Sequence, residues 1–210
     1  MIPETYRNIY LPIKFFLNSY RAFLEGKYGI SKIQSLLDED KLSLDYWKIL
    51  WVGTCTTLRS SIDLFQVDVK SCINEKIKNS IQSEWRYIKD NKKENSIFWD
   101  FLRRERDNII HEYKWDAYLS YLDTEGNAQE YHQTILGEPI AREHLSLLMK
   151  YGPYEGRNSL ELLKESAAWI EERIYCAITR AGYSPDEERN IVTFETRPSP
   201  EKLAEVTIIS

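Results

Sequence analysis

The residues best suited to chemistry lie in one short segment near the middle of the chain. Histidine titrates near neutral pH, so the imidazole of His111 can accept or donate a proton. Asp107 precedes it by one helical turn and can orient it. Arg104 and Arg106 add fixed positive charge, which suits a phosphate group. Together these side chains predict proton transfer beside a bound phosphate.

The spacing of apolar residues predicts that this segment is helical. One stripe, at steps of three and four residues, contains Trp99, Leu102, Arg106, Ile109 and Tyr113. An arginine in the middle of an apolar stripe needs a partner or a cleft, because an unpaired buried charge is costly. We therefore expect this face of the helix to line a cleft or an interface between two chains.

The string Arg106-Asp107-Asn108-Ile109-Ile110-His111 resembles the signature of the HEPN ribonuclease superfamily, an arginine and a polar residue followed at short range by a histidine. The longer pattern Arg106-x4-His111-x-Tyr113 is similar to the form found in HEPN toxins that pair with minimal nucleotidyltransferase antitoxins. A long preceding helix that contains Leu58–Phe65 fits the same architecture. The expected helical bundle extends the resemblance from the motif to residues 1–182.

The resemblance implies a metal-independent endoribonuclease that uses no cofactor and cleaves RNA by attack of a ribose 2′-hydroxyl. His111 would take the proton from that hydroxyl or protonate the leaving oxygen. Arg106 would stabilise the negative charge of the transition state. Asp107 or Asn108 would orient the imidazole or the phosphate. The spacing leaves open whether Arg104 or Arg106 faces the phosphate, because both fit the distance to His111 along the chain.

The resemblance also implies partners. One motif helix offers one histidine, whereas cleavage needs a base and an acid, and family members solve this by dimerising with their motif helices face to face. We therefore expect a homodimer in which Arg106 and His111 of both chains line one cleft. Tyr113 would be a nucleotidylation target for an antitoxin such as a minimal nucleotidyltransferase, and the protein would act as a toxin or in host defence.

Two other interpretations stay open. The chain could be a catalytically silent HEPN-like module that binds nucleotides or a protein partner through the same cleft. Alternatively, the motif could be a coincidence in a generic helical bundle. In that case Arg106 and His111 would point apart, or away from any cleft.

The rest of the sequence predicts an all-α fold, an up-and-down bundle of four to five helices. The expected helices cover residues 11–26, 30–37, 43–88 (with a break near Gly53 or within 67–69), 95–118 and 159–181. Asn158 is expected to cap the last of them. Residues 144–150 could add one short helix, and residues 129–135 could form a strand of a small hairpin.

One helical domain is expected over residues 1–182, with an insertion-like region at 119–157. Residues 183–210 are expected to form an irregular C-terminal tail with β-like pieces at 191–196 and 206–209. With eight glycines and seven prolines in 210 residues, the chain has too few turn-forming residues for an all-β fold.

Composition and charge limit the classes of function. The three cysteines are widely spaced, which predicts a reducing compartment, the cytoplasm, and offers no paired metal ligands. His132 and His144 have no ligand spacing to a cysteine or an acid. The segment Leu11–Leu17 is too short and too polar for a signal peptide, and no run is long enough to span a membrane.

Nucleic-acid binding would have to come from a local patch, because the formal net charge is −5. Between Trp85 and Arg106 there are seven basic residues and four acidic ones. Trp85, Tyr87 and Trp99 are interleaved with them and could stack bases. The alternative is that the polar stretch at 89–94 is a solvated loop.

Overall fold

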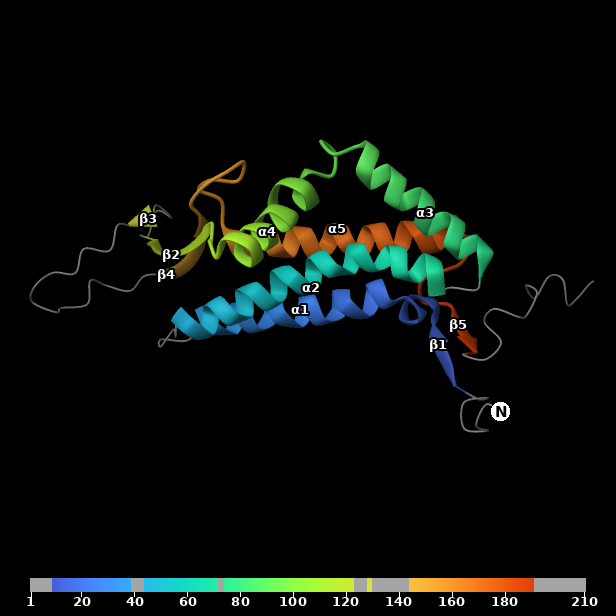
Figure 1. Ribbon diagram of the computed structural model, residues 1–210. Coiled ribbons are helices and arrows are strands. Elements are labelled where there is room, and N and C mark those ends of the chain that lie inside the picture. The colour runs from blue at the N-terminus through green and yellow to red at the C-terminus, as the bar shows by residue number, and fades with distance from the viewer. Residues whose placement is uncertain (1–8, 39–43, 72–73, 123–127, 130–143, 191–210) are drawn as a thin grey trace, which may run out of the picture.

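Two long antiparallel helices, α1 (Asn18–Leu37) and α2 (Leu44–Ser71), form the base of the fold (Figure 1). In this computed structural model, residues 9–38, 44–71, 74–122, 128–129 and 144–190 are described. Three further helices pack on the pair: α3 (Glu75–Asp90), α4 (Arg103–Glu112) and α5 (Ser159–Arg180). The expected bundle of four to five helices is confirmed, and two small sheets lie at its opposite ends (Figure 1).

Helix α1 is continuous, whereas the sequence predicted two helices separated at Gly26. Gly26 and Gly29 lie inside α1 and face α2, where a Cβ atom at either position would collide with the side chains of Leu58 and Thr54. The glycines therefore permit close helix–helix approach instead of ending a helix. A short 3-10 turn, Ile13–Phe16, precedes α1.

Helix α2 runs through both positions at which a break was expected, Gly53 and residues 67–69. Asp68 explains part of this, because its buried carboxylate accepts hydrogen bonds from the backbone N–H groups of Asn18 (2.8 Å) and Ser19 (3.0 Å) at the start of α1. The next helix, α3, begins after Asn74, whose Oδ1 accepts from the N–H groups of Lys76 and Ile77.

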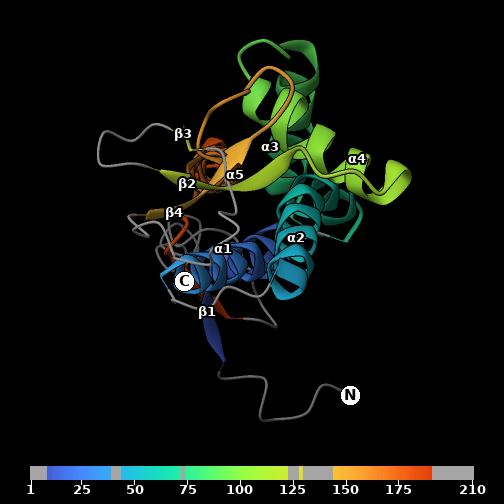
Figure 2. The same cartoon turned by 90° about the vertical axis from the view of Figure 1, so that its left-hand side faces the viewer.

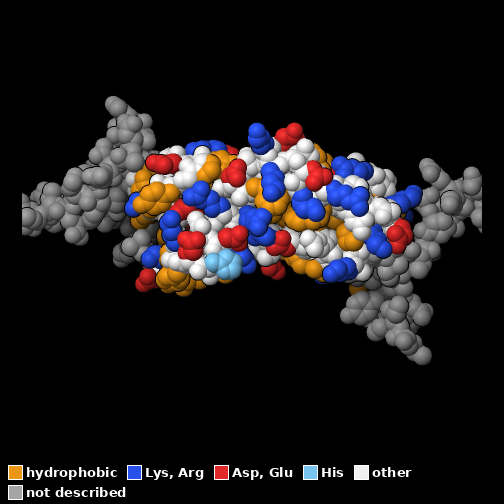
Figure 3. Space-filling view, turned by 45° about the horizontal axis from the view of Figure 1, so that its top comes forward, with side chains coloured by type: hydrophobic (Ala, Val, Ile, Leu, Met, Phe, Trp, Pro, Cys, Tyr) orange, Lys and Arg blue, Asp and Glu red, His pale blue; other side chains and the backbone are white. Residues whose placement is uncertain are grey.

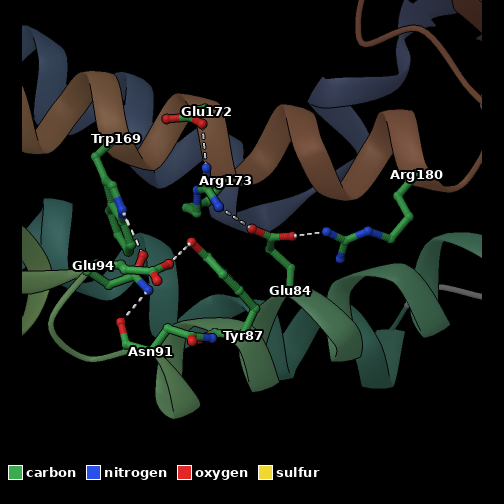
Figure 4. A network of polar contacts seen from close by, with 9 residues as sticks. Glu84, Tyr87, Asn91, Glu94, Trp169, Glu172, Arg173 and Arg180 are labelled. Atoms are coloured by element: carbon green, nitrogen blue, oxygen red, sulfur yellow. Dashed lines mark hydrogen bonds and ion pairs between the residues drawn. The ribbon is translucent and has the colours of Figure 1, made fainter.

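A buried ion-pair network joins α3 to α5 (Figure 4). The Glu84 carboxylate is fully buried and lies 2.9 Å from the guanidinium groups of both Arg173 and Arg180. Arg173 also lies over the ring of Tyr87, with 5.3 Å between its Cζ and the ring centroid. Further along, the indole N–H of Trp169 donates to Asn95 Oδ1 (3.1 Å). These contacts hold α3 at a fixed position on α5.

The segment after α4 contains a three-stranded antiparallel sheet with the order β3-β2-β4, made of β2 (Ala117–Leu122), β3 (Ala128–Gln129) and β4 (His144–Met149). The prediction of a short helix at 144–150 was wrong, because β4 pairs with β2 from Ala117↔Met149 to Leu122↔His144. Most of the expected strand at 129–135 lies outside the described residues. The expectation of a small antiparallel sheet in this part of the chain is confirmed.

At the other end of the bundle, β1 (Tyr10–Pro12) pairs with β5 (Glu188–Asn190). The first residues of the predicted tail are thus attached to the start of the chain, and Lys14 forms an ion pair with Asp186. The expected β-like pieces at 191–196 and 206–209 lie outside the described residues.

The hydrophobic core takes buried side chains from α1, α2, α3, α5 and the turn that leads into α4. Figure 2 views these helices from the end that carries the sheet β3-β2-β4. The largest buried side chains there include Trp51, Phe65, Phe98 and Phe101. Helix α5 follows the prediction closely: Asn158 Oδ1 accepts from the N–H groups of Leu160 and Glu161, and a buried stripe runs along its length. Among the described helices, none is long and apolar enough to cross a membrane.

Candidate functional site

Helix α4 carries the predicted site and is preceded by a π-helical turn, Ile97–Leu102. The buried side of this unit consists of Phe98, Phe101, Leu102, Glu105 and Ile109. Leu102 and Ile109 of the predicted apolar stripe are buried. The remaining positions were wrong, and Glu105 is buried where the prediction placed Arg106. The side chain of Arg106 is partly exposed, at 31%.

Glu105 joins α4 to its neighbours. Its Oε1 accepts a hydrogen bond from the indole N–H of Trp51 on α2 (2.8 Å), and the nearby backbone of Asp116 and Ala117 also favours the charged form of the carboxylate. Burial raises the pKa of Glu105 to about 7, and the nearby charge of Asp116 acts in the same direction. The hydrogen bonds oppose this rise without overcoming it.

Helix α4 ends at Glu112, six residues before the predicted end near Tyr118. Tyr113 adopts the left-handed conformation (φ 53°), and the N–H of Lys114 bonds to the carbonyl of Asn108 across the helix end. The Tyr113 ring packs edge-on against Trp115 (4.6 Å between centroids) and is 81% exposed. Tyr113 is therefore a surface residue and no part of a buried stripe.

Three of the predicted site residues contact one another on the exposed flank of α4. Arg106 Nη1 lies 2.9 Å from Asp107 Oδ1 and 3.4 Å from Nε2 of His111. The other carboxylate oxygen of Asp107 lies 3.5 Å from Nε of Arg103. Asp107 thus bridges two guanidinium groups. Arg103 was not among the predicted residues, although its position one helical turn before Asp107 is visible in the sequence.

Arg104 and Asn108 lie on the opposite flank of α4. Asn108 Nδ2 donates to Asp116 Oδ2 (2.9 Å), and Arg104 Nε lies 3.4 Å from the same oxygen. The guanidinium of Arg104 also lies against Gly152, where an added Cβ would come within 2.8 Å of it. Both side chains therefore face the sheet and its loop, while Arg106 contacts His111.

Asp116 is a residue that sequence reasoning missed. It is 1% exposed and pairs with Asn108, Arg104 and, at 3.9 Å, Lys114. The sequence predicted a helix that continued to Tyr118, with position 116 inside it. In the structure α4 ends at Glu112 and the chain turns back, so the contacts of Asp116 with Arg104 and Asn108 could not be predicted from helical spacing.

Arg59 brings a further positive charge from α2. Its side chain is mostly buried (16% exposed), lies over the ring of Phe98 and forms an ion pair with Asp63. Burial lowers the pKa of Arg59; Asp107 opposes this shift, and the positive charges of Arg103 and Arg106 add to it. Arg59 therefore belongs to the same electrostatic cluster as the exposed flank of α4.

The arrangement places a group that can transfer protons beside permanent positive charge on an exposed surface, which is what catalysis at a phosphate ester requires. Within the described ranges, no group of three His, Cys, Asp or Glu side chains is placed to hold a metal ion. His144 begins β4, and His132 lies outside the described residues.

Comparison with known proteins adds no relative to this picture. No protein-family model, no curated protein and no solved structure matches the chain. The residues and contacts described above are consequently the grounds for assigning a function.

Proposed function

We propose that this protein is a metal-independent endoribonuclease of the HEPN type, acting as a toxin or defence nuclease. The observation that carries the proposal is the contact between Arg106 Nη1 and His111 Nε2, 3.4 Å apart on the exposed flank of α4. A coincidental motif would leave these two side chains pointing apart. Their convergence supports the resemblance of segment 106–113 to the HEPN signature.

The chemistry follows from the two side chains. The imidazole of His111 accepts the proton of a ribose 2′-hydroxyl as its oxygen bonds to phosphorus. The bond from phosphorus to the 5′-oxygen breaks, and that oxygen takes up a proton, leaving a 2′,3′-cyclic phosphate and a 5′-hydroxyl. Arg106 stabilises the extra negative charge of the transition state, and Asp107 holds the Arg106 guanidinium in place.

The reaction needs a second proton-transfer group, which a homodimer supplies as the partner's copy of the same helix. Exposed apolar side chains next to His111 in the chain support this: Ile110 (48% exposed) on α4 and Tyr113 (81%) directly after the end of α4. Ile110 directly precedes His111, so an interface that covers it brings two copies of the motif together. Burying exposed apolar area is the main driving force of association.

Arg104 and Asn108 have supporting roles in this proposal. Both are engaged by Asp116, on the flank of α4 that faces the sheet. They position the helix rather than contact the RNA. In the proposed mechanism the phosphate therefore binds to Arg106, the residue that contacts His111.

Tyr113 remains the proposed site of control by an antitoxin, such as a minimal nucleotidyltransferase. A modifying enzyme needs access to the phenol, and the side chain is 81% exposed in a single chain. Transfer of a nucleotide to this hydroxyl would add bulk and negative charge close to the proposed dimer interface.

RNA cleavage by the purified protein in EDTA tests the function. Wild type is compared with His111→Ala and Arg106→Ala, and with Arg21→Ala as a control that removes an exposed arginine on α1. Cleavage is expected in wild type and the control, with 2′,3′-cyclic phosphate ends, and is expected to be lost in the two site variants. Circular dichroism checks that each variant is folded. A folded wild-type dimer that cleaves none of several RNAs would contradict the proposal.

The alternative is a catalytically silent HEPN-like module that binds nucleotides or a protein. One observation favours it: Arg106 is already engaged by Asp107 and His111 within one chain, a self-contained cluster that can bind phosphate without reacting. Binding of RNA or nucleotide that depends on Arg106, with no cleavage by the dimer, would establish this function instead.

A further inference from the structure

A continuous line of contacts leads from His111 away from the end of α4. Arg106 lies against His111 (3.4 Å), Asp107 joins Arg106 (2.9 Å) to Arg103 (3.5 Å), and the Cζ of Arg103 lies 4.9 Å from the centroid of the Trp99 ring. The same ring has the Nζ of Lys92 at 5.0 Å from its centroid. Cations and an aromatic ring thus alternate from the end of α4 to the segment after α3.

Trp99 is held as a rigid platform. Its indole N–H donates to the carbonyl of Ile88 (3.0 Å), and its ring packs edge-on against Phe98 (5.0 Å between centroids). The indole edge is therefore used by the fold, while the side chain stays partly exposed. The flexible side chains of Arg103 and Lys92 lie over this ring, so a base can stack on its face when one of these cations moves aside.

The charge around this platform is positive despite the acidic net charge of the chain. Figure 3 shows Lys and Arg side chains gathered along the α3 and α4 face, with carboxylates among them. Asp63 pairs with Arg59, and Asp107 pairs with Arg103 and Arg106, whereas Glu94 accepts a hydrogen bond from the uncharged hydroxyl of Tyr87. Asp100 is exposed nearby. The positive charges of Arg103 and Arg106 also act on Arg59, where they add to the effect of burial and lower its pKa.

We infer that this line is a binding track for single-stranded RNA, which extends the proposed nuclease site from His111 through Arg103 to Lys92. Phosphates lie against Arg106, Arg103 and Lys92, and one base stacks on Trp99 in place of a cation that now lies over the ring. The track selects single strands, because a base must leave its own stack before it can lie on an aromatic side chain. This inference rests on the proposed function, whose substrate class it narrows.

Binding is measured with a short fluorescent 2′-O-methyl oligonucleotide, which lacks the attacking hydroxyl, so that cleavage cannot affect the result. Fluorescence anisotropy of the full chain gives the Kd and its salt dependence. The variants are Trp99→Leu, Trp99→Phe, Arg103→Gln and Lys92→Gln. The chain offers a matched control on α1, where Lys32 lies 5.0 Å over the exposed ring of Tyr28; the control variants are Lys32→Gln and Tyr28→Leu.

Trp99→Leu is expected to raise the Kd about tenfold without changing the salt dependence, since stacking is lost but no charge is removed. Trp99→Phe keeps an aromatic face and is expected to recover most of the binding, which also separates stacking from any loss of stability. Arg103→Gln and Lys92→Gln are each expected to weaken binding and to reduce the slope of log K against log salt by about 0.7. The Lys32 and Tyr28 variants are expected to bind like wild type.

Equal binding by wild type and all the track variants overturns the inference, and so does equal affinity for the duplex of the same oligonucleotide. The two proposals fail in different ways. If wild type does not cleave unmodified RNA but binding still depends on Trp99 and Lys92, the nuclease fails and the track stands. If wild type cleaves RNA and the track variants bind as well as wild type, the track fails and the nuclease stands.

Discussion

Arg106 reaches along its own helix so that its Nη1 lies 3.4 Å from Nε2 of His111, five residues later. Such a contact between positions five apart needs a long side chain held in one direction. Asp107 provides this support, because its Oδ1 lies 2.9 Å from the same nitrogen. The Asp107 carboxylate thus positions the guanidinium of Arg106, whereas the sequence predicted a role in orienting the imidazole or the phosphate.

Arg106→Lys is expected to lower the rate of RNA cleavage by about 10²-fold, because an ammonium cannot contact Asp107, His111 and a phosphate in the same fixed geometry. Arg104→Lys is the matched control and is expected to change the rate less than about threefold, since Arg104 contacts Asp116 and the Gly152 loop. Single-turnover cleavage rates measure both. The reverse order of effects would assign the phosphate to Arg104.

Ile110→Lys is expected to convert the proposed dimer to a folded monomer and to abolish cleavage, because it places a charge in the apolar surface next to His111. Val67→Lys is the control: it replaces a similarly exposed apolar side chain (45%) on α2. Light scattering after size-exclusion chromatography gives the masses. A wild type that is monomeric at the concentration where it cleaves RNA would argue against a composite site.

The burial of Glu105 predicts a specific pH dependence of stability. Its pKa is raised from 4.5 to about 7 in the fold, so the folded state favours the protonated form. Its contribution is therefore complete below about pH 4.5 and is lost as the pH rises to about 7, a change of about 3 kcal/mol in the free energy of unfolding.

Glu105→Gln removes this titration and retains a neutral acceptor for Trp51. As the pH rises from about 4.5 to about 7, the free energy of unfolding of wild type is expected to fall relative to that of Glu105→Gln. Urea unfolding at several pH values measures it. A difference that stays constant over this range would show that Glu105 ionises normally in the folded protein.

Asp116→Ala is expected to destabilise the fold by about 2–4 kcal/mol, because it removes a buried carboxylate that holds Asn108 and Arg104. Asp186→Ala is the control, since Asp186 pairs with Lys14 while remaining 72% exposed, and is expected to cost less than about 1 kcal/mol. Chemical denaturation measures both values. Similar losses in the two variants would mean that the Asp116 cluster does not anchor α4.

Elements with signals in nearby residues could be predicted from the sequence. Asn158 at the start of α5 is an example, since the cap and the residues it bonds are neighbours. The stripe on α4 could not be assigned in the same way. Leu102 and Ile109 fit both a stripe through Arg106 and one through Glu105, and the choice depends on Trp51, which lies on another helix.

The contacts among the candidate site residues divide in the same way into local and tertiary ones. Arg106, Asp107 and His111 belong to one helix, and helical spacing brings them close. The roles of Arg59 and Asp116 depend on tertiary contacts. The end of α4 depends on the left-handed conformation of Tyr113, a residue type that does not indicate a turn in the sequence. Gly26 shows the opposite case, a strong local stop signal overridden by the need for close packing against Leu58.

Trp99 lies in the π-helical turn Ile97–Leu102, which directly precedes α4. The direction in which Trp99 points relative to the motif therefore depends on the number of residues in this turn. A π-turn accommodates one residue more than an α-helical turn, and each residue of a regular helix corresponds to a rotation of about 100°. Deleting one residue between Trp99 and Arg103 would restore a regular α-helical turn and rotate Trp99 about the helix axis relative to Arg103, while Arg106, Asp107 and His111 would keep their mutual register. A change of one residue in this turn would therefore alter the direction of the surface beside the motif without altering the motif itself.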